Sequence, residues 1–102
     1  MKIELAKSEL IHFVGIGGIG MSGLALIMKE LGFNVQGSDI SNNKNIERLK
    51  KNKIKINIGH NKQNIKKSTI IVISSAIHKN NTEYLEAKKN KLPIYKRGEM
   101  LA

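Results

Sequence analysis

The chain has 102 residues, a length that suits a single domain with one hydrophobic core. It contains no cysteine, which excludes a disulfide framework and a thiolate metal site. No apolar run approaches the roughly 18 residues that span a bilayer, and the N-terminus lacks the apolar core of a signal peptide. We therefore expect a cytoplasmic protein without a membrane partner.

The formal net charge is +10, which raises the possibility of a nucleic-acid partner. All basic residues except Arg48 and Arg97 are lysines, and they are scattered among asparagines. Arginine is the preferred residue for reading bases and for gripping phosphates in pairs of hydrogen bonds. With two Tyr, two Phe and no Trp, the chain also has too few aromatic side chains for a single-strand stacking surface. We expect a solvated basic surface and no specific nucleic-acid partner.

The first half of the chain reads as strand, helix, strand. Residues 10–14 form a short apolar run that ends at a glycine loop, as a buried parallel strand does before a crossover. Residues 19–31 carry apolar residues at three- and four-residue steps, which predicts an amphipathic helix stopped by Gly32. Its apolar positions are Ile19, Leu24, Ile27, Met28 and Leu31. Residues 33–39 alternate with period two and predict a second strand.

The second half continues the alternation. Asn42 or Asn43 can cap a helix to about residue 52, with Ile46 and Leu49 facing inward. A third strand is expected at 54–58, and residues 61–67 are ambiguous. The β-branched run 69–75 predicts a fourth strand. Asn80 or Asn81 can cap a helix over 82–90, and residues 92–95 read as a last strand.

This order, βαβαβ(α)βαβ, predicts an α/β fold of Rossmann-like type. Its mainly parallel sheet should have about five strands with helices on both faces. Residues 1–102 should form one domain. The chain stops inside an incipient, uncapped helix at residues 97–102, which we interpret as a piece of a longer protein.

The pattern Gly15-x-Gly17-x-x-Gly20 lies between the first strand and the first helix, where a phosphate-binding loop requires it. In this interpretation Gly15 permits a tight turn, Gly17 lets the backbone approach a diphosphate, and Gly20 lets the helix pack near the strand. The helix start presents unpaired N–H groups and the positive end of its dipole. Gly18 and Ser22 could add donors. The alternative is a tight turn whose glycines serve packing only.

Candidate ligand contacts follow the expected strands at their carboxyl ends. Asp39 could accept from a ribose hydroxyl, or could instead cap the amides of Ser41 or Asn42. The small residues at 37–38 would leave room for a nucleoside. His60 has two alternative interpretations, a ligand contact or a solvated loop residue. Ser74, Ser75, Ala76 and Ile77 leave the fourth strand at the same edge.

The remaining histidines have simpler interpretations, His12 as a satisfied core residue and His78 as a surface residue. We find no paired carboxylates, no metal-ligand spacing, no nucleophile with a base and no P-loop, so we expect no catalytic residue and no metal site in this segment. An NAD-binding domain of a dehydrogenase or nucleotide sensor would share the glycine loop and Asp39. It remains the alternative function.

Several stretches resemble the Mur ligases. Residues 11–25 read Ile-His-Phe-Val-Gly-Ile-Gly-Gly-Ile-Gly-Met-Ser-Gly-Leu-Ala, like the opening of that family. Similar stretches follow at 37–39, 59–60 and 74–77, with Asn81-x-Glu83 after them. Residues 93–101 resemble the segment that runs from Pro to Arg-Ala-Glu-Met-Leu, with Gly98 in place of Ala. Within the family, the ligase that recycles murein tripeptide is the nearest alternative, but as that ligase is known its loop lacks the Gly-Ile-Gly-Gly run.

The resemblance implies the N-terminal domain of a three-domain cytoplasmic enzyme of peptidoglycan synthesis. This domain would hold the UDP part of UDP-N-acetylmuramate while L-alanine is ligated to the muramoyl carboxylate. ATP and Mg²⁺ would bind the missing central domain, and a C-terminal domain would help close the site, so the segment alone should be inactive. The implied diphosphate contacts are Gly15, Ile16, Gly17, Gly18, Ile19, Gly20, Met21 and Ser22. The implied uridine contacts are Asp39, His60, Ser74, Ser75, Ala76 and Ile77.

Overall fold

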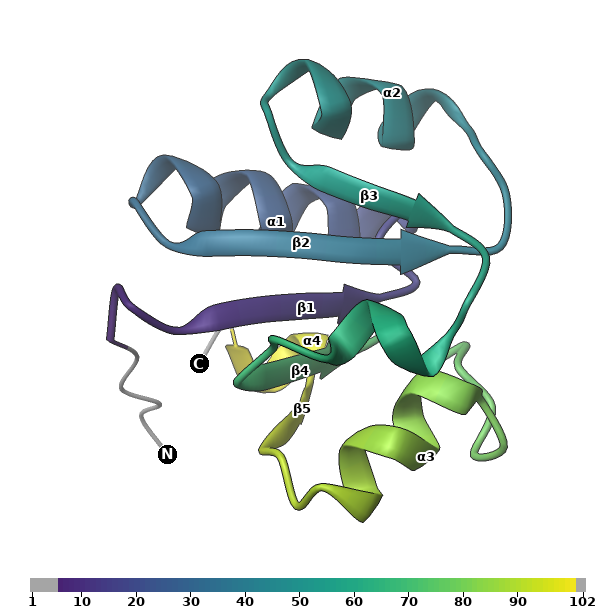
Figure 1. Cartoon of the computed structure of the whole chain (residues 1–102). Helices are drawn as coiled ribbons and strands as arrows, with labels where there is room; N and C mark the ends of the chain where they lie inside the picture. Colours follow the sequence, from purple (N-terminus) through teal and green to yellow (C-terminus); the bar gives the residue numbers. More distant parts are fainter. Residues whose placement is uncertain (1–5, 101–102) are drawn as a thin grey trace.

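The fold is a single parallel sheet of five strands in the order β3-β2-β1-β4-β5 (Figure 1). The computed structural model describes residues 6–100. Residues 1–5 and the last two residues of the expected C-terminal helix lie outside that range. The strands are β1 (Leu10–Val14), β2 (Asn34–Asp39), β3 (Lys55–Ile58), β4 (Ile70–Ile73) and β5 (Ile94–Lys96). All four pairings are parallel, which confirms the predicted fold class.

The connections between the strands are helical. The helices are α1 (Ile19–Glu30), α2 (Lys44–Lys51), α3 (Thr82–Lys89) and α4 (Arg97–Met100), and the ambiguous stretch holds the short 3₁₀ helix η1 (Lys62–Ile65). Of the two candidate caps for each helix, Asn43 caps α2 and Asn81 caps α3. Within residues 6–100, no helix combines the length and the apolar character needed to cross a bilayer.

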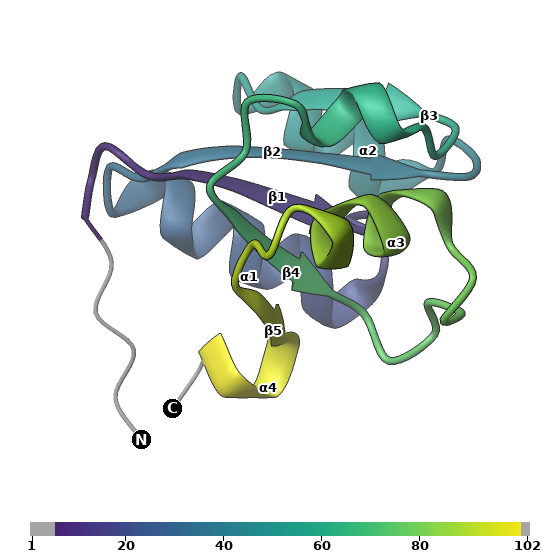
Figure 2. The ribbon, with the colours of Figure 1, turned by 60° about the horizontal axis from the view of Figure 1, so that its bottom comes forward.

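Alternate residues of the strands supply two cores on opposite faces of the sheet. In β1, Ile11 and Phe13 pack with α1 and α2, whereas Val14 packs with η1 and α3. Figures 1 and 2 show α1 and α3 on opposite sides of the sheet. The prediction of helices on both faces is therefore confirmed, and β1 is buried on both sides.

The buried face of α1 differs from the one that the apolar spacing indicated. Ile19, Ile27 and Leu31 are exposed, with relative accessibilities of 89%, 53% and 59%. Leu24 and Met28 of the predicted set are buried, which confirms that part of the prediction, and Met21 and Ala25 are buried beside them. The buried stripe therefore overlaps the predicted one and is turned around the helix from it. The angle at which the chain leaves the glycine loop decides which of the two stripes meets the sheet.

The registers bring the carboxyl ends of the strands to one edge. Val14 pairs with Ser38 on one side and with Ile73 on the other, and Asp39 pairs with Ile58. The arrowheads of β1, β2 and β3 point to the right in Figure 1 and mark this edge. Open parallel sheets bind ligands there, beside the point where the strand order reverses. In this sheet the reversal lies between β1 and β4.

Candidate functional site

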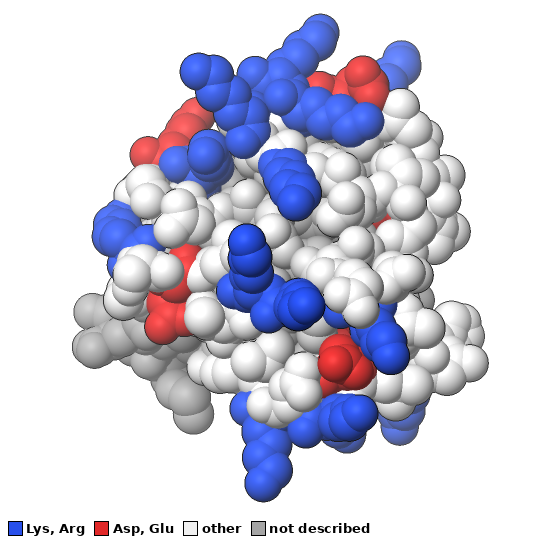
Figure 3. Space-filling view, viewed as in Figure 1, with Lys and Arg blue, Asp and Glu red and all other residues white. Residues whose placement is uncertain are grey.

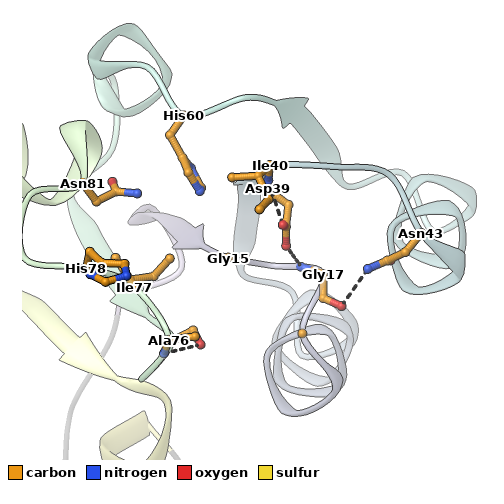
Figure 4. A pocket seen from close by; sticks show the side chains of 12 residues that line it. Gly15, Gly17, Asp39, Ile40, Asn43, His60, Ala76, Ile77, His78 and Asn81 are labelled. Carbon is orange, nitrogen blue, oxygen red and sulfur yellow. Dashed lines mark hydrogen bonds between the residues drawn. The ribbon is translucent and has the colours of Figure 1, made fainter.

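A pocket of about 390 Å³ opens at the carboxyl edge of the sheet (Figure 4). Its walls come from the glycine loop and from the chain that follows β2, β3 and β4. Eight of the predicted site residues line it: Gly15, Gly17, Gly18, Asp39, His60, Ser74, Ala76 and Ile77. Ile40, Asn43, His78 and Asn81 complete the lining. The tertiary structure thus joins segments that are far apart in the sequence.

The glycine loop begins with a tight turn held by β2. Gly15 has φ +82°, a conformation that favours glycine, so its expected role in the turn is confirmed. The amides of Gly15 and Ile16 both donate to the carbonyl oxygen of Ser38, at 2.9 and 3.0 Å. Ile16 is fully buried. Its side chain occupies the space above Gly37, so the interpretation of that glycine as room for a nucleoside is wrong.

The carboxylate of Asp39 binds a backbone amide of the glycine loop. Its Oδ2 accepts from the amide of Gly17 at 2.7 Å and its Oδ1 from the amide of Ile40 at 2.7 Å. Neither Ser41 nor Asn42 is capped by it, contrary to the alternative interpretation. A Cβ on Gly17 would lie 2.8 Å from Oδ2 of Asp39. Gly17 therefore lets the loop lie against this carboxylate, and the amide of Gly17 already has an acceptor.

The first turn of α1 keeps its amides open. Gly18 is the N-cap and supplies no capping side chain, and the first intrahelical bond runs from the amide of Ser22 to the carbonyl of Gly18 at 2.8 Å. Among the described residues the amides of Ile19, Gly20 and Met21 have no acceptor. Three free N–H groups at the positive end of a twelve-residue helix attract an anion.

Arg97 lies beside this helix start. A Cβ on Gly20 would lie 2.8 Å from its Nε and 3.0 Å from its Cζ. The atoms nearest to an added Cβ on Gly20 all belong to Arg97, so this glycine leaves room for the Arg97 side chain, and its expected packing role against the strand stays a prediction. Sequence reasoning quoted Arg97 only within a family segment and missed this position. A guanidinium next to free helix N–H groups forms a second element of an anion site.

Below the pocket lies a buried polar network centred on Glu83. Its Oε1 accepts from Nε2 of His12 at 2.7 Å and from Oγ of Ser38 at 2.6 Å. Its Oε2 accepts from Nδ2 of Asn64 at 2.7 Å and from the amide of Asn61 at 3.1 Å. Burial raises the pKa of Glu83, but the hydrogen bonds from His12 and Ser38, the electrostatic attraction of His12 and the hydrogen bond from Asn64 outweigh it and lower the pKa from 4.5 to about 2. The carboxylate is therefore ionised and fully satisfied at neutral pH.

Two histidines meet this network from different sides. His12 is fully buried, and its second nitrogen, Nδ1, lies 2.9 Å from Nε2 of Gln36, which confirms the prediction of a satisfied core histidine. His60 contacts the network through Nδ1, 2.9 Å from Oγ of Ser38. Its ring points into the pocket (Figure 4). Sequence reasoning named Glu83 only as part of a motif and assigned it no role.

The other predicted site residues do not line the pocket. Met21 and Ser22 are buried, and the hydroxyl of Ser22 donates to the carbonyl of Ile19 at 3.1 Å, so it is not a free donor. Ser75 is exposed beside the pocket. Asn43 and Asn81 were predicted only as helix caps. Their position after the carboxyl ends of β2 and β4 was the signal that could have placed them at the pocket.

Charge is dispersed over the face of the molecule that Figure 3 shows. Figure 3 shows Lys and Arg side chains in separate groups from α2 at the top to the lower edge, with acidic side chains between them. His78 is exposed, as predicted. Among residues 6–100 there is no group of three or more His, Cys, Asp or Glu side chains that could hold a metal ion.

Comparison with known proteins gives a consistent result. Residues 10–102 match the model of the Mur ligase family, catalytic domain. The whole chain is 78% identical to 22% of the UDP-N-acetylmuramate–L-alanine ligase of Pelagibacter ubique (strain HTCC1062). Over 98% of the chain it is 59% identical to 21% of the ligase of the same name from Rickettsia typhi (strain ATCC VR-144 / Wilmington). The chain thus spans about a fifth of the length of these curated relatives.

Solved structures agree in fold. The UDP-N-acetylmuramate-alanine ligase of Thermotoga maritima superimposes with a TM-score of 0.86 at 35% identity, over 90% of this chain and 21% of that one. The UDP-N-acetylmuramate:L-alanyl-gamma-D-glutamyl-meso-diaminopimelate ligase of Neisseria meningitides gives a TM-score of 0.85 at 28% identity, over 91% of this chain and 30% of that one.

Proposed function

The chain belongs to the Mur ligase family, and on this premise we propose that it is the UDP-sugar-binding domain of an enzyme that ligates L-alanine to UDP-N-acetylmuramate. The names of its relatives, both UDP-N-acetylmuramate–L-alanine ligases, support this substrate pair. The complete enzyme would be a three-domain protein of peptidoglycan synthesis. Family membership also favours a UDP-sugar over NAD as the ligand of the glycine loop.

The observation that carries the proposal is the uncapped start of α1 beside the pocket. A diphosphate there would accept from the free amides of Ile19, Gly20 and Met21 and would pair with Arg97. The uridine would extend from there along the carboxyl edge, between Asp39 and His60 on one side and Ala76 and Ile77 on the other. A pocket of about 390 Å³ lies in the range of small-molecule sites.

The residues that the structure describes do not fit ATP and Mg²⁺. These residues offer no cluster of acidic or imidazole ligands for a metal ion, and the chain has no Gly-Lys-Ser or Gly-Lys-Thr phosphate loop. In the proposed enzyme the central domain would hold both, and the muramoyl carboxylate would be activated there. The 102-residue chain by itself should therefore bind the UDP-sugar without ligase turnover.

The N-cap position offers a test that separates binding from folding. Gly18 has φ −65° and ψ 154°, which any residue adopts, and the nearest atom to an added Cβ is 3.6 Å away. In Gly18→Asp the new carboxylate can cap the free amides, so the free energy of unfolding should stay equal or rise by a few tenths of a kcal/mol. The same carboxylate would repel a diphosphate and occupy its donors.

We expect UDP and UDP-N-acetylmuramate, titrated by calorimetry, to bind Gly18→Asp at least about tenfold more weakly than the unchanged chain, since the lost interactions together exceed about 1.4 kcal/mol. Gly18→Asn, which caps without charge, should be intermediate. Gly18→Ala, which leaves the amides open, should retain binding. A folded Gly18→Asp variant with undiminished UDP affinity would contradict the proposal. So would tight binding of NADH, titrated in parallel, together with no binding of UDP.

A further inference from the structure

The buried network beneath the pocket has a definite arrangement of protons. Nε2 of Gln36 donates to the backbone carbonyl of Asn64 at 2.8 Å, which fixes the orientation of the Gln36 amide. Of the two remaining neighbours of Nε2, Nδ1 of His12 at 2.9 Å is nearer than Oγ of Ser68 at 3.3 Å, so the second N–H of that amide faces Nδ1 of His12. Nδ1 of His12 is consequently an acceptor, and its proton sits on Nε2, which donates to Glu83.

The same reasoning applies to Ser38. Its hydroxyl has one proton, and at 2.6 Å from an ionised carboxylate oxygen that proton must point to Glu83, since two oxygens that only accept would repel each other. Oγ of Ser38 is then an acceptor toward its other two neighbours, Nε2 of His12 at 3.5 Å and Nδ1 of His60 at 2.9 Å. Because Nδ1 of His60 is the nearer and faces an accepting oxygen, it must carry a proton.

The four lone-pair sites of Glu83 are already filled by His12, Ser38, Asn61 and Asn64. Nδ1 of His60 lies 3.5 Å from Oε2 of Glu83, too far for a direct hydrogen bond. Glu83 therefore acts on His60 through Ser38. No buried side-chain N or O atom of the described residues lacks a hydrogen-bond partner, so this arrangement leaves no polar group unsatisfied.

We infer that Glu83 and Ser38 are positioning residues that hold a proton on Nδ1 of His60, so that in the singly protonated ring Nε2 faces the pocket as a hydrogen-bond acceptor. An acceptor at this place selects a ligand group that donates, such as a sugar hydroxyl or the imide N–H of a uracil. It does not suit a phosphate oxygen, which also accepts. The inference deepens the proposed function, on which its ligand class rests: His60 would contact the nucleoside and the start of α1 the diphosphate.

Side-chain ¹H–¹⁵N correlation spectra of the ¹⁵N-labelled chain at about pH 8 test the arrangement without any ligand. The chain has three histidines, and a His78→Gln spectrum completes the assignment. We expect opposite tautomers for the two network histidines, Nε2–H for His12 and Nδ1–H for His60. Exposed His78 provides the internal reference for an unconstrained ring. An Nε2–H tautomer of His60 in the unchanged chain would overturn the inference.

Replacing the connecting hydroxyl supplies the second test. In Ser38→Ala the Nδ1 proton of His60 loses its acceptor, so His60 should shift toward the Nε2–H tautomer while His12 keeps its own. Ser74→Ala, which removes a hydroxyl from the opposite wall of the pocket, should leave the His60 tautomer unchanged. A purely structural role of Ser38 would lower stability without moving the tautomer, and that result would also overturn the inference.

Addition of UDP separates this inference from the proposed function. On binding, the Nε2 signal of His60 should shift as for a nitrogen that accepts a hydrogen bond, and the ring should remain singly protonated. A doubly protonated His60 in the complex would indicate a phosphate contact and would contradict the assigned acceptor. Absence of UDP binding would count against the proposed function alone, because the tautomers of the free chain decide the inference.

Discussion

At the scale of single residues, the ends of the three long helices follow one pattern with different residues. After α1 the amide of Phe33 donates to the carbonyl of Met28 and that of Gly32 to Lys29, and Gly32 has φ +95°. These are the two bonds of a Schellman motif. Helices α2 and α3 end with the same pair of bonds, but there the left-handed positions are held by Lys53 (φ 64°) and Lys91 (φ 58°).

Glycine at either lysine position should stabilise the chain. A side chain in the left-handed region costs roughly 1–2 kcal/mol, and the extra flexibility of glycine in the unfolded state offsets part of that gain. We expect Lys53→Gly and Lys91→Gly each to raise the free energy of unfolding in urea by about 0.5–1 kcal/mol, additively because they follow different helices. Lys50→Gly, in the interior of α2, should lower it by about 1 kcal/mol. A loss of stability in both end variants would show that the lysines are not strained.

At the scale of elements, the crossover from β1 through the glycine loop to α1 depends on close contact with β2. A Cβ on Gly37 would lie 2.5 Å from Cδ1 of Ile16 and 2.8 Å from the carbonyl oxygen of Phe13. A backbone oxygen in a paired strand cannot move aside as a flexible side chain can. Because Gly37 has no side chain, the glycine loop can fold back against β2 at this position. The path of the loop in turn sets where α1 begins.

We therefore expect Gly37→Ala to lower the free energy of unfolding by about 3 kcal/mol, the upper part of the range for overpacked sites. The matched control is Gly23→Ala inside α1, where an added Cβ meets no atom within 4 Å. That change should raise stability by roughly 0.5–1 kcal/mol, because alanine favours a helix over glycine. Urea unfolding measures both. Equal, small effects of the two substitutions would contradict the close contact.

At the scale of the whole molecule, Glu83 ties together elements from both halves of the chain. Its carboxylate on α3 bonds to His12 on β1, Ser38 on β2 and Asn64 on η1. The residue is fully buried, so its charge depends on all of these donors. His60, which lines the pocket, contacts the same network through Ser38, so the network lies between the fold and the proposed site.

This network predicts acid sensitivity of the fold. Because the pKa of Glu83 is lowered to about 2 in the folded state, its ionisation stabilises the protein above the unfolded pKa of about 4.5. That contribution, on the order of 3 kcal/mol, should decline as the pH falls from about 4.5 toward 2. The measurement is urea unfolding of the unchanged chain and of Glu83→Gln from pH 7 to pH 3. The stability difference between them should shrink below about pH 4.5, and a constant difference would contradict the role of the charge.

The sequence by itself determined the α/β class, the order of the elements, the glycine turn and the buried state of His12. These follow from local signals, because strand and helix periodicity, caps and glycine positions are set by neighbouring residues. The motifs also indicated the family correctly. Local signals placed Leu24 and Met28 on the buried face of α1, but they could not decide which neighbouring apolar residues accompany them into the core.

Only the tertiary structure decided which residues of the site contact one another. Asp39 holds the Gly17 amide, Arg97 lies at the start of α1, and Glu83 reaches His60 through Ser38. Each of these contacts joins residues at least 22 positions apart in the chain. Their partners are fixed by strand order and register, which bring separate carboxyl ends to one edge. Hydrogen bonding over such separations depends on three-dimensional proximity, and no spacing along the sequence encodes it.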